Sequence, residues 1–138
     1  MNCKNCGAEI DASATVCEKC GQPTKEKPVS TFVEAIKTCF NKYATFEGRA
    51  NRAEYWWWAL FNLLIGILGV VPILGWIITI GLLIPSIAVA VRRLHDIGKS
   101  GFYYFLCFIP IVGAIILLIL FLQPSQEGAN QYGENPNA

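Results

Sequence analysis

The sequence predicts an all-α integral membrane protein with three transmembrane helices. There is no Asp, Glu, Lys, Arg or His between Tyr55 and Val91, and none between Phe102 and Leu122. Apolar runs of about 18 residues or more indicate membrane spans, whereas a soluble core is periodic and interrupted by charges. A mean hydropathy of +0.42 agrees with this class. The first 20 residues are different in character, because they hold four of the six cysteines.

Composition excludes some functions. The chain has 138 residues, and its formal net charge of +1 argues against a globally basic nucleic-acid binder. Its first residues contain no apolar segment typical of a cleavable signal peptide, so we expect the first span to direct insertion. A cytoplasmic, reducing location for the N-terminus follows if the early cysteines bind metal.

The N-terminal cysteines form two Cys-x-x-Cys pairs, and residues 1–22 are predicted to be a zinc ribbon. The four thiolates are those of Cys3, Cys6, Cys17 and Cys20. Four sulfurs suit tetrahedral Zn²⁺ and leave no open position, which indicates a structural rather than a catalytic ion. So small a segment would need the metal to fold. The alternatives are a redox Cys-x-x-Cys motif and disulfides.

A polar, proline-bearing linker over residues 23–29 is expected to lead into an amphipathic helix at 30–44. Thr31 and Glu34 have the spacing of a capping box. Apolar residues recur at helical intervals from Phe32 to Tyr43. Two interpretations stay open: the helix lies on the bilayer surface, or it packs against the protein's own cytoplasmic loops.

The membrane domain covers residues 30–138, with a three-helix unit at 55–122. The 37 charge-free residues from Tyr55 to Val91 are too many for one span of about 20 residues. Turn-forming residues at 71–75 divide them into spans at about 55–71 and 74–91. A third span is expected at about 102–122. Aromatic residues beside basic ones, as at 55–58 and 102–105, are typical of a membrane interface.

Basic residues predict the topology. Arg49 and Arg52 precede the first span, and Arg92, Arg93 and Lys99 lie between the second and third. The positive-inside rule therefore places the N-terminus and the 92–101 loop in the cytoplasm. The tail at 123–138 has neither Lys nor Arg, and with three spans it would be extracytoplasmic.

Four motifs carry a resemblance to a known family. They are Phe46-x-Gly48-Arg49-x-x-Arg52-x-Glu54-Tyr55-Trp56, Arg92-Arg93-Leu94-His95-Asp96-x-Gly98-x-Ser100-Gly101, Pro110-x-x-Gly113 and Gly128-x-Asn130-x-Tyr132-Gly133-x-Asn135-Pro136. Over about residues 30–138 the chain resembles the bacterial inner-membrane family called domain of unknown function 805. The cysteine pairs lie outside this resemblance. Family members commonly have Asp where this chain has Asn135. The resemblance implies an inner-membrane location and no settled activity.

Two polar segments are the candidate site of the membrane domain. The members are Arg49, Arg52, Glu54, Arg92, Arg93, His95, Asp96 and Lys99. One interpretation is structural, with Glu54 and Asp96 pairing with arginines of the opposite segment. Another is a site for anionic lipid headgroups, which basic clusters at a cytoplasmic interface attract. A third is catalysis or transport, against which the lack of charged residues inside the spans argues.

These patterns favour a small integral membrane scaffold or regulatory protein whose cytoplasmic zinc module contacts a protein partner. The alternative is an anionic-lipid-binding enzyme or transporter that uses the Arg92–Asp96 segment. An enzyme is the less favoured class, and the sequence assigns no catalytic residue. The expected surroundings are the lipid bilayer of the bacterial plasma (inner) membrane, and no nucleic-acid partner is expected.

Overall fold

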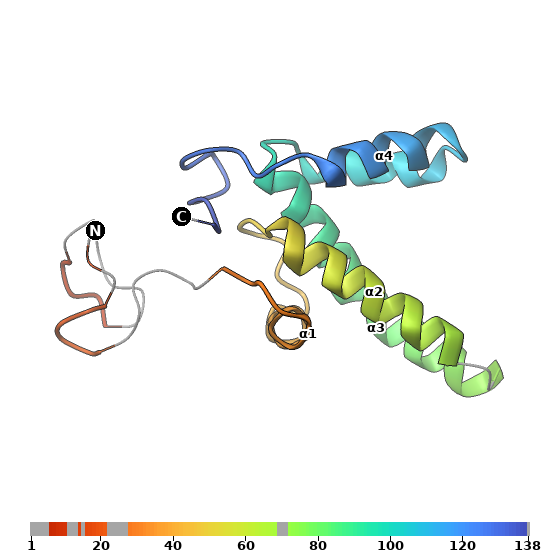
Figure 1. Cartoon of the computed structure of the whole chain (residues 1–138), viewed down its shortest axis with the longest axis horizontal. Helices are drawn as coiled ribbons and strands as arrows, with labels where there is room; N and C mark the ends of the chain where they lie inside the picture. Colours follow the sequence, from red (N-terminus) through yellow and green to blue (C-terminus); the bar gives the residue numbers. More distant parts are fainter. Residues whose placement is uncertain (1–5, 11–13, 15, 22–27, 69–71, 138) are drawn as a thin grey trace.

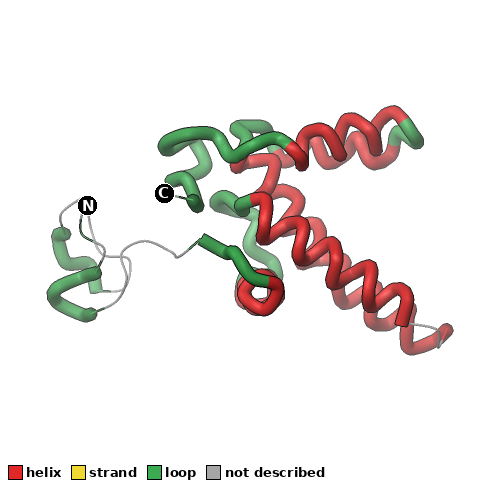
Figure 2. The backbone as a smooth tube through the Cα atoms, in the orientation of Figure 1, coloured by secondary structure: helices red, strands yellow, loops and turns green. Residues whose placement is uncertain are grey.

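The structure is a computed structural model that describes residues 6–10, 14, 16–21, 28–68 and 72–137. In these ranges the named elements are all helical, as predicted, and no strand is among them. They are four α-helices and one 3₁₀ helix: α1 (Phe32–Asn41), α2 (Arg52–Leu68), α3 (Pro72–Asp96), η1 (Gly101–Phe108) and α4 (Val112–Leu122) (Figures 1 and 2).

Helix α1 begins at the capping box that the sequence predicts. The Thr31 side chain accepts a hydrogen bond from the Glu34 amide, and the Glu34 carboxylate accepts one from the Thr31 amide. The apolar face of α1 packs on α2, with the Phe32 and Trp57 ring centroids 5.9 Å apart. In the structure the helix thus packs on α2, a contact that neither interpretation named.

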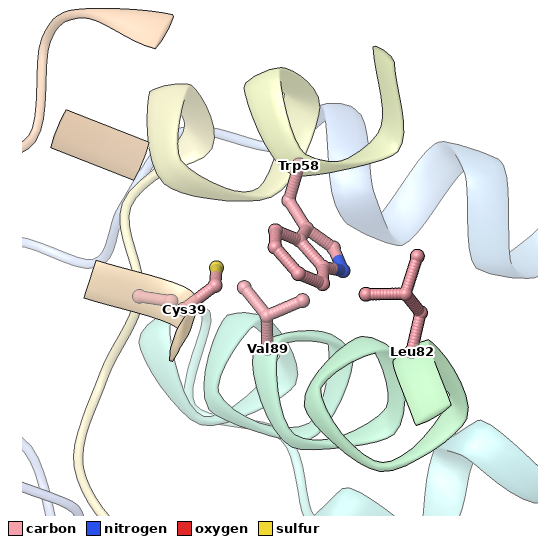
Figure 3. Packing of buried hydrophobic residues seen from close by; sticks show 5 residues of the cluster. Cys39, Trp58, Leu82 and Val89 are labelled. Carbon is pink, nitrogen blue, oxygen red and sulfur yellow. The ribbon is translucent and has the colours of Figure 1, made fainter. Parts of the chain in front are cut away.

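Helices α2 and α3 run side by side as a hairpin (Figure 1). Their core contains Cys39 of α1 together with Trp58, Leu82 and Val89 (Figure 3). Helix α3 is long and apolar enough to cross a membrane, over Gly75–Asp96. Pro85 lies within it. The helix continues beyond the predicted end at residue 91, so Arg92–Asp96 form its last turn rather than a loop.

The predicted turn at 71–75 falls partly on residues 69–71, which are outside the described part of the chain. Residues 72–75 are the first turn of α3 instead. Pro72 is the first helical residue, where a proline is well tolerated because the first amides of a helix have no intrahelical acceptor.

The segment at 102–122, predicted to be a single transmembrane helix, is not one continuous helix in the structure. The segment forms η1 and α4, which pack against each other as a second hairpin (Figure 2). The chain reverses at residues 109–111. Ile111 has φ 67° and ψ −69°, a classic γ-turn closed by the Val112 amide and the Pro110 carbonyl at 2.8 Å. Pro110 cannot continue a helix without losing an amide hydrogen bond.

A second core closes this hairpin onto the end of α3. Its buried residues are Ala90, Leu94, Leu117, Leu120 and Phe121. Helix α4 therefore ends where α3 ends, and the tail begins beside the polar segments. The Gln126 amide donates to the Asp96 carbonyl over 3.1 Å. The tail was predicted to lie across the membrane from residues 92–101, but in the structure it lies next to Asp96, because the third apolar segment folds back on itself.

Candidate functional site

A polar cluster lies where the two hairpins meet. It consists of six polar residues that are at most 7% exposed: Arg49, Asn51, Glu54, Arg92, Arg93 and Asp96. They come from the loop before α2, the first turn of α2 and the last turn of α3. Burying charges is costly unless each is paired and hydrogen-bonded, so their partners decide what the cluster can do.

Asp96 is the centre of the cluster. One carboxylate oxygen accepts a hydrogen bond from Arg49 Nε at 3.0 Å, and the other accepts one from Arg93 Nη1. The Asp96 side chain is fully buried, and those of Arg49 and Arg93 are at most 1% exposed. A carboxylate shared by two buried guanidinium groups is a strong charge-assisted arrangement.

Arg49 uses its whole guanidinium group. Besides Asp96 Oδ1, it donates to the carbonyls of Asp96 at 3.1 Å, Gln126 at 2.7 Å, Gly128 at 2.7 Å and Gly133 at 3.4 Å. Five donors thus meet five acceptors, which is all that an arginine can supply. Three of the acceptors belong to the tail, so Arg49 fixes the tail to the helices.

Arg92 is less completely paired. Its Nη1 donates to Glu54 Oε1 at 2.6 Å, but Nε and Nη2 are buried without a hydrogen-bond partner. Arg93 Nε is in the same situation, although its Nη2 donates to the Phe121 and Gln123 carbonyls. Three arginines and two carboxylates leave one positive charge in excess within the cluster.

His95 lies beside the cluster and not in an acid–base pair with Asp96. Its ring stacks on Tyr132 of the tail, with centroids 3.8 Å apart and planes 3° apart. Its Nδ1 lies 3.2 Å from the Gly48 carbonyl. Each of its close contacts is thus with a loop residue, which suits a positioning role.

Besides His95, two of the candidate residues are outside the buried cluster. Arg52 and Lys99 are exposed, and Lys99 Nζ lies 5.8 Å from the centre of the Tyr103 ring. Glu54 pairs with Arg92, and Asp96 pairs with Arg49, so each carboxylate pairs with an arginine of the other segment. Because Arg52 and Lys99 are exposed, their side chains are accessible to solvent or to lipid headgroups.

The turn after α3 has a clear local cause. Gly98 has φ +72°, its amide donates to the His95 carbonyl, and the Lys99 amide donates to the Leu94 carbonyl. These are the two hydrogen bonds of a Schellman motif with glycine at its left-handed position. The Gly-Lys-Ser sequence therefore ends a helix here.

Some members of the site were not found from the sequence. Asn51 caps α2, because its Oδ1 accepts a hydrogen bond from the Glu54 amide at 2.7 Å. Its Nδ2 donates to the Val29 carbonyl at 2.8 Å. The tail carbonyls that receive Arg49 were also missed. A carbonyl has no sequence signature, but the Gly- and Asn-rich composition of the tail was a usable signal.

The described cysteines near the N-terminus come together. The sulfurs of Cys6, Cys17 and Cys20 all lie within 4.8 Å of one another, and those of Cys6 and Cys17 are 3.7 Å apart. Gly7 and Gly21, which follow Cys6 and Cys20, have φ of +69° and +70°. Cys3, the fourth predicted ligand, lies outside the described residues, as do parts of the predicted 1–22 ribbon and 23–29 linker.

The two remaining cysteines differ in environment. Cys39 of α1 is fully buried, and this burial raises the pKa of its thiol from 9.0 to about 12. A thiol so protonated and shielded is inert near neutral pH. Cys107 of η1 is exposed on the surface of the second hairpin.

Comparison with known proteins places the chain in a family. The family model described as "Protein of unknown function (DUF805)" matches residues 43–134 of the sequence. Inner membrane protein YhaI of Escherichia coli strain K12 is 38% identical over 103 residues, which cover 68% of this chain and 87% of YhaI. Inner membrane protein YhaH of the same strain is 35% identical over 107 residues, covering 68% and 88%. These relatives support a location in the bacterial inner membrane.

No solved structure matches the chain. The matched range contains both polar segments and most of the tail, and it excludes the cysteine pairs. The chain therefore belongs to the DUF805 family of bacterial inner membrane proteins, whose function is unknown.

Proposed function

We propose that this protein is a small inner-membrane scaffold that carries a structural zinc module on the cytoplasmic side for contact with a protein partner. One observation carries the proposal: three cysteine sulfurs converge within 4.8 Å in a segment that precedes the membrane domain. Inside that domain, the Asp96 carboxylate is already paired with Arg49 and Arg93, and Arg49 also donates to carbonyls of the tail. The module before α1 is therefore the best-equipped part of the chain for an outside contact.

The sulfur geometry fits zinc. A tetrahedral site with Zn–S bonds of about 2.3 Å has sulfurs about 3.8 Å apart, and Cys6 and Cys17 are separated by 3.7 Å. Cys3 would supply the fourth thiolate. Such a closed site stabilises its own fold and exposes a small rigid surface, without an open position for chemistry.

Metal content tests the first half of the proposal. Full-length protein purified in mild detergent is expected to hold about one zinc per chain by elemental analysis. Cys17→Ser should lose most of it, because Cys17 is buried in the centre of the group. Cys107→Ser is the matched control and should keep the metal. Equal zinc in the two variants would overturn the assignment.

Partner capture tests the second half. Proteins crosslinked to the wild-type chain in membranes are identified by mass spectrometry and compared with those from Cys17→Ser and Cys107→Ser. Loss of specific partners in Cys17→Ser alone supports the scaffold. Identical partner lists from all three chains, at equal membrane levels, would refute it.

One observation favours a second candidate, the binding of an anionic lipid headgroup. The cluster has a positive charge in excess, and buried donors of Arg92 and Arg93 have no partner among the described residues. A groove of about 610 Å³ lies nearby, lined by Arg52 with Asn51, Ser125, Asn135 and Asn137. Lipids that co-purify with Arg52→Ala should contain less anionic phospholipid than those with wild type. Unchanged lipid content would remove this candidate.

A further inference from the structure

The second hairpin has the dimensions of one leaflet. The 8 residues of η1 rise about 16 Å at about 2.0 Å per residue. The 11 residues of α4 rise about 16 Å at about 1.5 Å per residue. The hydrocarbon core of a bilayer is about 30 Å thick, so each arm spans about half of it. By contrast, the 25 residues of α3 rise about 37 Å, enough to cross completely.

The hairpin surface is apolar on its outside. Phe102, Phe105 and Phe108 are 78%, 60% and 77% exposed. Residues three apart are eclipsed in a 3₁₀ helix, and these rings stack in a row with centroids 6.1 Å apart. Helix α4 exposes a set of aliphatic side chains as well: Val112, Ile115, Ile116, Leu118, Ile119 and Leu122. So large an exposed apolar surface marks contact with lipid or another protein.

Polar groups bound this surface at one end only. Ser100 caps η1, and Gln123 follows α4, beside the polar cluster. The opposite end is the turn at 109–111, where Ile111 is 76% exposed. There the amides of Ile109, Val112 and Gly113 donate to the carbonyls of Leu106, Pro110 and Ile109. Internal pairing of this kind is what a turn within hydrocarbon requires.

We propose that η1 and α4 form a half-membrane hairpin, which enters one leaflet from the side of the polar cluster, is covered by the acyl chains of that leaflet, and leaves on the same side. Lipid is the occupant because the family is an inner-membrane one, the arms match a leaflet in depth, and polar residues bound only the base. A partner helix would cover one face, whereas η1 and α4 both expose apolar side chains. The C-terminus then lies on the same side as the N-terminus.

Reporter fusions to the full chain test this topology. A green fluorescent protein, which fluoresces only in the cytoplasm, and an alkaline phosphatase, which is active only outside, are attached in turn after Ala138 and before Met1. The hairpin predicts the same compartment for both ends. Opposite compartments would mean that α4 crosses the membrane, and they would overturn the proposal.

A second measurement avoids the large fusions. A short epitope tag after Ala138 is exposed to protease in spheroplasts and in inverted membrane vesicles. Cleavage in inverted vesicles alone, together with the same pattern for an N-terminal tag, supports the hairpin. Cleavage of the C-terminal tag in spheroplasts with protection of the N-terminal one refutes it. Either result is independent of zinc and of any protein partner, so it leaves the proposed scaffold to its own tests.

Discussion

Arg49 is a charged residue that is buried in the membrane domain, with each of its donors hydrogen-bonded. Its side chain is 1% exposed, yet it donates to one carboxylate oxygen and four carbonyls. Arginine suits this position because its planar group offers five donors in fixed directions, whereas lysine offers three. Arg52, three residues later, is exposed and outside the buried cluster. Two arginines close in sequence thus have different roles.

Replacing Arg49 with Ala is expected to destabilise the protein by about 3–5 kcal/mol, the usual cost of removing one partner of a buried ion pair. Asp96 would keep Arg93, but the tail carbonyls would lose their donor. Arg52→Ala is the control, with an expected change within about 0.5 kcal/mol, as for other surface substitutions. Thermal unfolding in mild detergent measures both. Similar midpoints for the two variants would contradict the assigned role of Arg49.

At the scale of the element, the η1–α4 hairpin depends on the close approach of Gly113 in α4 to the backbone of Leu106 in η1. A Cβ atom added to Gly113 would lie 1.8 Å from the Leu106 carbonyl oxygen and 3.1 Å from Ile109 Cβ. Only glycine lets the start of α4 come this near to the backbone of η1. With Pro110 and the γ-turn at Ile111, this close approach makes the chain reverse.

Gly113→Ala is expected to destabilise the hairpin by about 1–3 kcal/mol or more, since the clash is with backbone and cannot be relieved by a rotamer change. Gly66→Ala is the control, and this substitution is expected to increase the stability instead. A Cβ at Gly66 meets nothing within 4 Å, and alanine in a helix interior is favoured by about 0.5–1 kcal/mol over glycine. Thermal unfolding of both variants is the measurement. Equal stability would show that α4 does not approach η1 at Gly113.

At the scale of the whole molecule, the tail joins the two hairpins. It supplies carbonyls to Arg49 and stacks Tyr132 on His95. Asn130 Nδ2 donates to the His95 carbonyl at 2.9 Å. The tail therefore covers the polar cluster. Its carbonyls accept hydrogen bonds from the buried Arg49 guanidinium group, whose donors would otherwise have no acceptor there.

Deleting residues 124–138 is expected to reduce stability by at least about 3 kcal/mol, because the two 2.7 Å hydrogen bonds from Arg49 to the Gln126 and Gly128 carbonyls are lost. Each hydrogen bond to a charged group is worth about 1.5–3 kcal/mol. Deleting only 135–138 keeps Gln126, Gly128 and Gly133 and should change stability little. Protease resistance and unfolding temperature in detergent compare the two truncations. If both behave alike, the tail does not secure Arg49.

The sequence alone determined the helical membrane class, the capping box of α1 and the family. These features depend on neighbouring residues or on the composition of a single segment, so short-range patterns are sufficient. The pairing of carboxylates with arginines of the opposite segment was also reachable, because both segments were placed on one side of the bilayer.

Only the tertiary structure decided the course of residues 102–122 and the position of the tail beside the polar cluster. Twenty-one apolar residues are compatible with one crossing or with two half-crossings, since both bury the same composition in lipid. The choice depends on contacts between residues distant in sequence: Gly113 against Leu106, the α4 core residues against Ala90 and Leu94, and Arg49 with the tail carbonyls. Such contacts depend on the three-dimensional arrangement and leave no periodic signal in the chain.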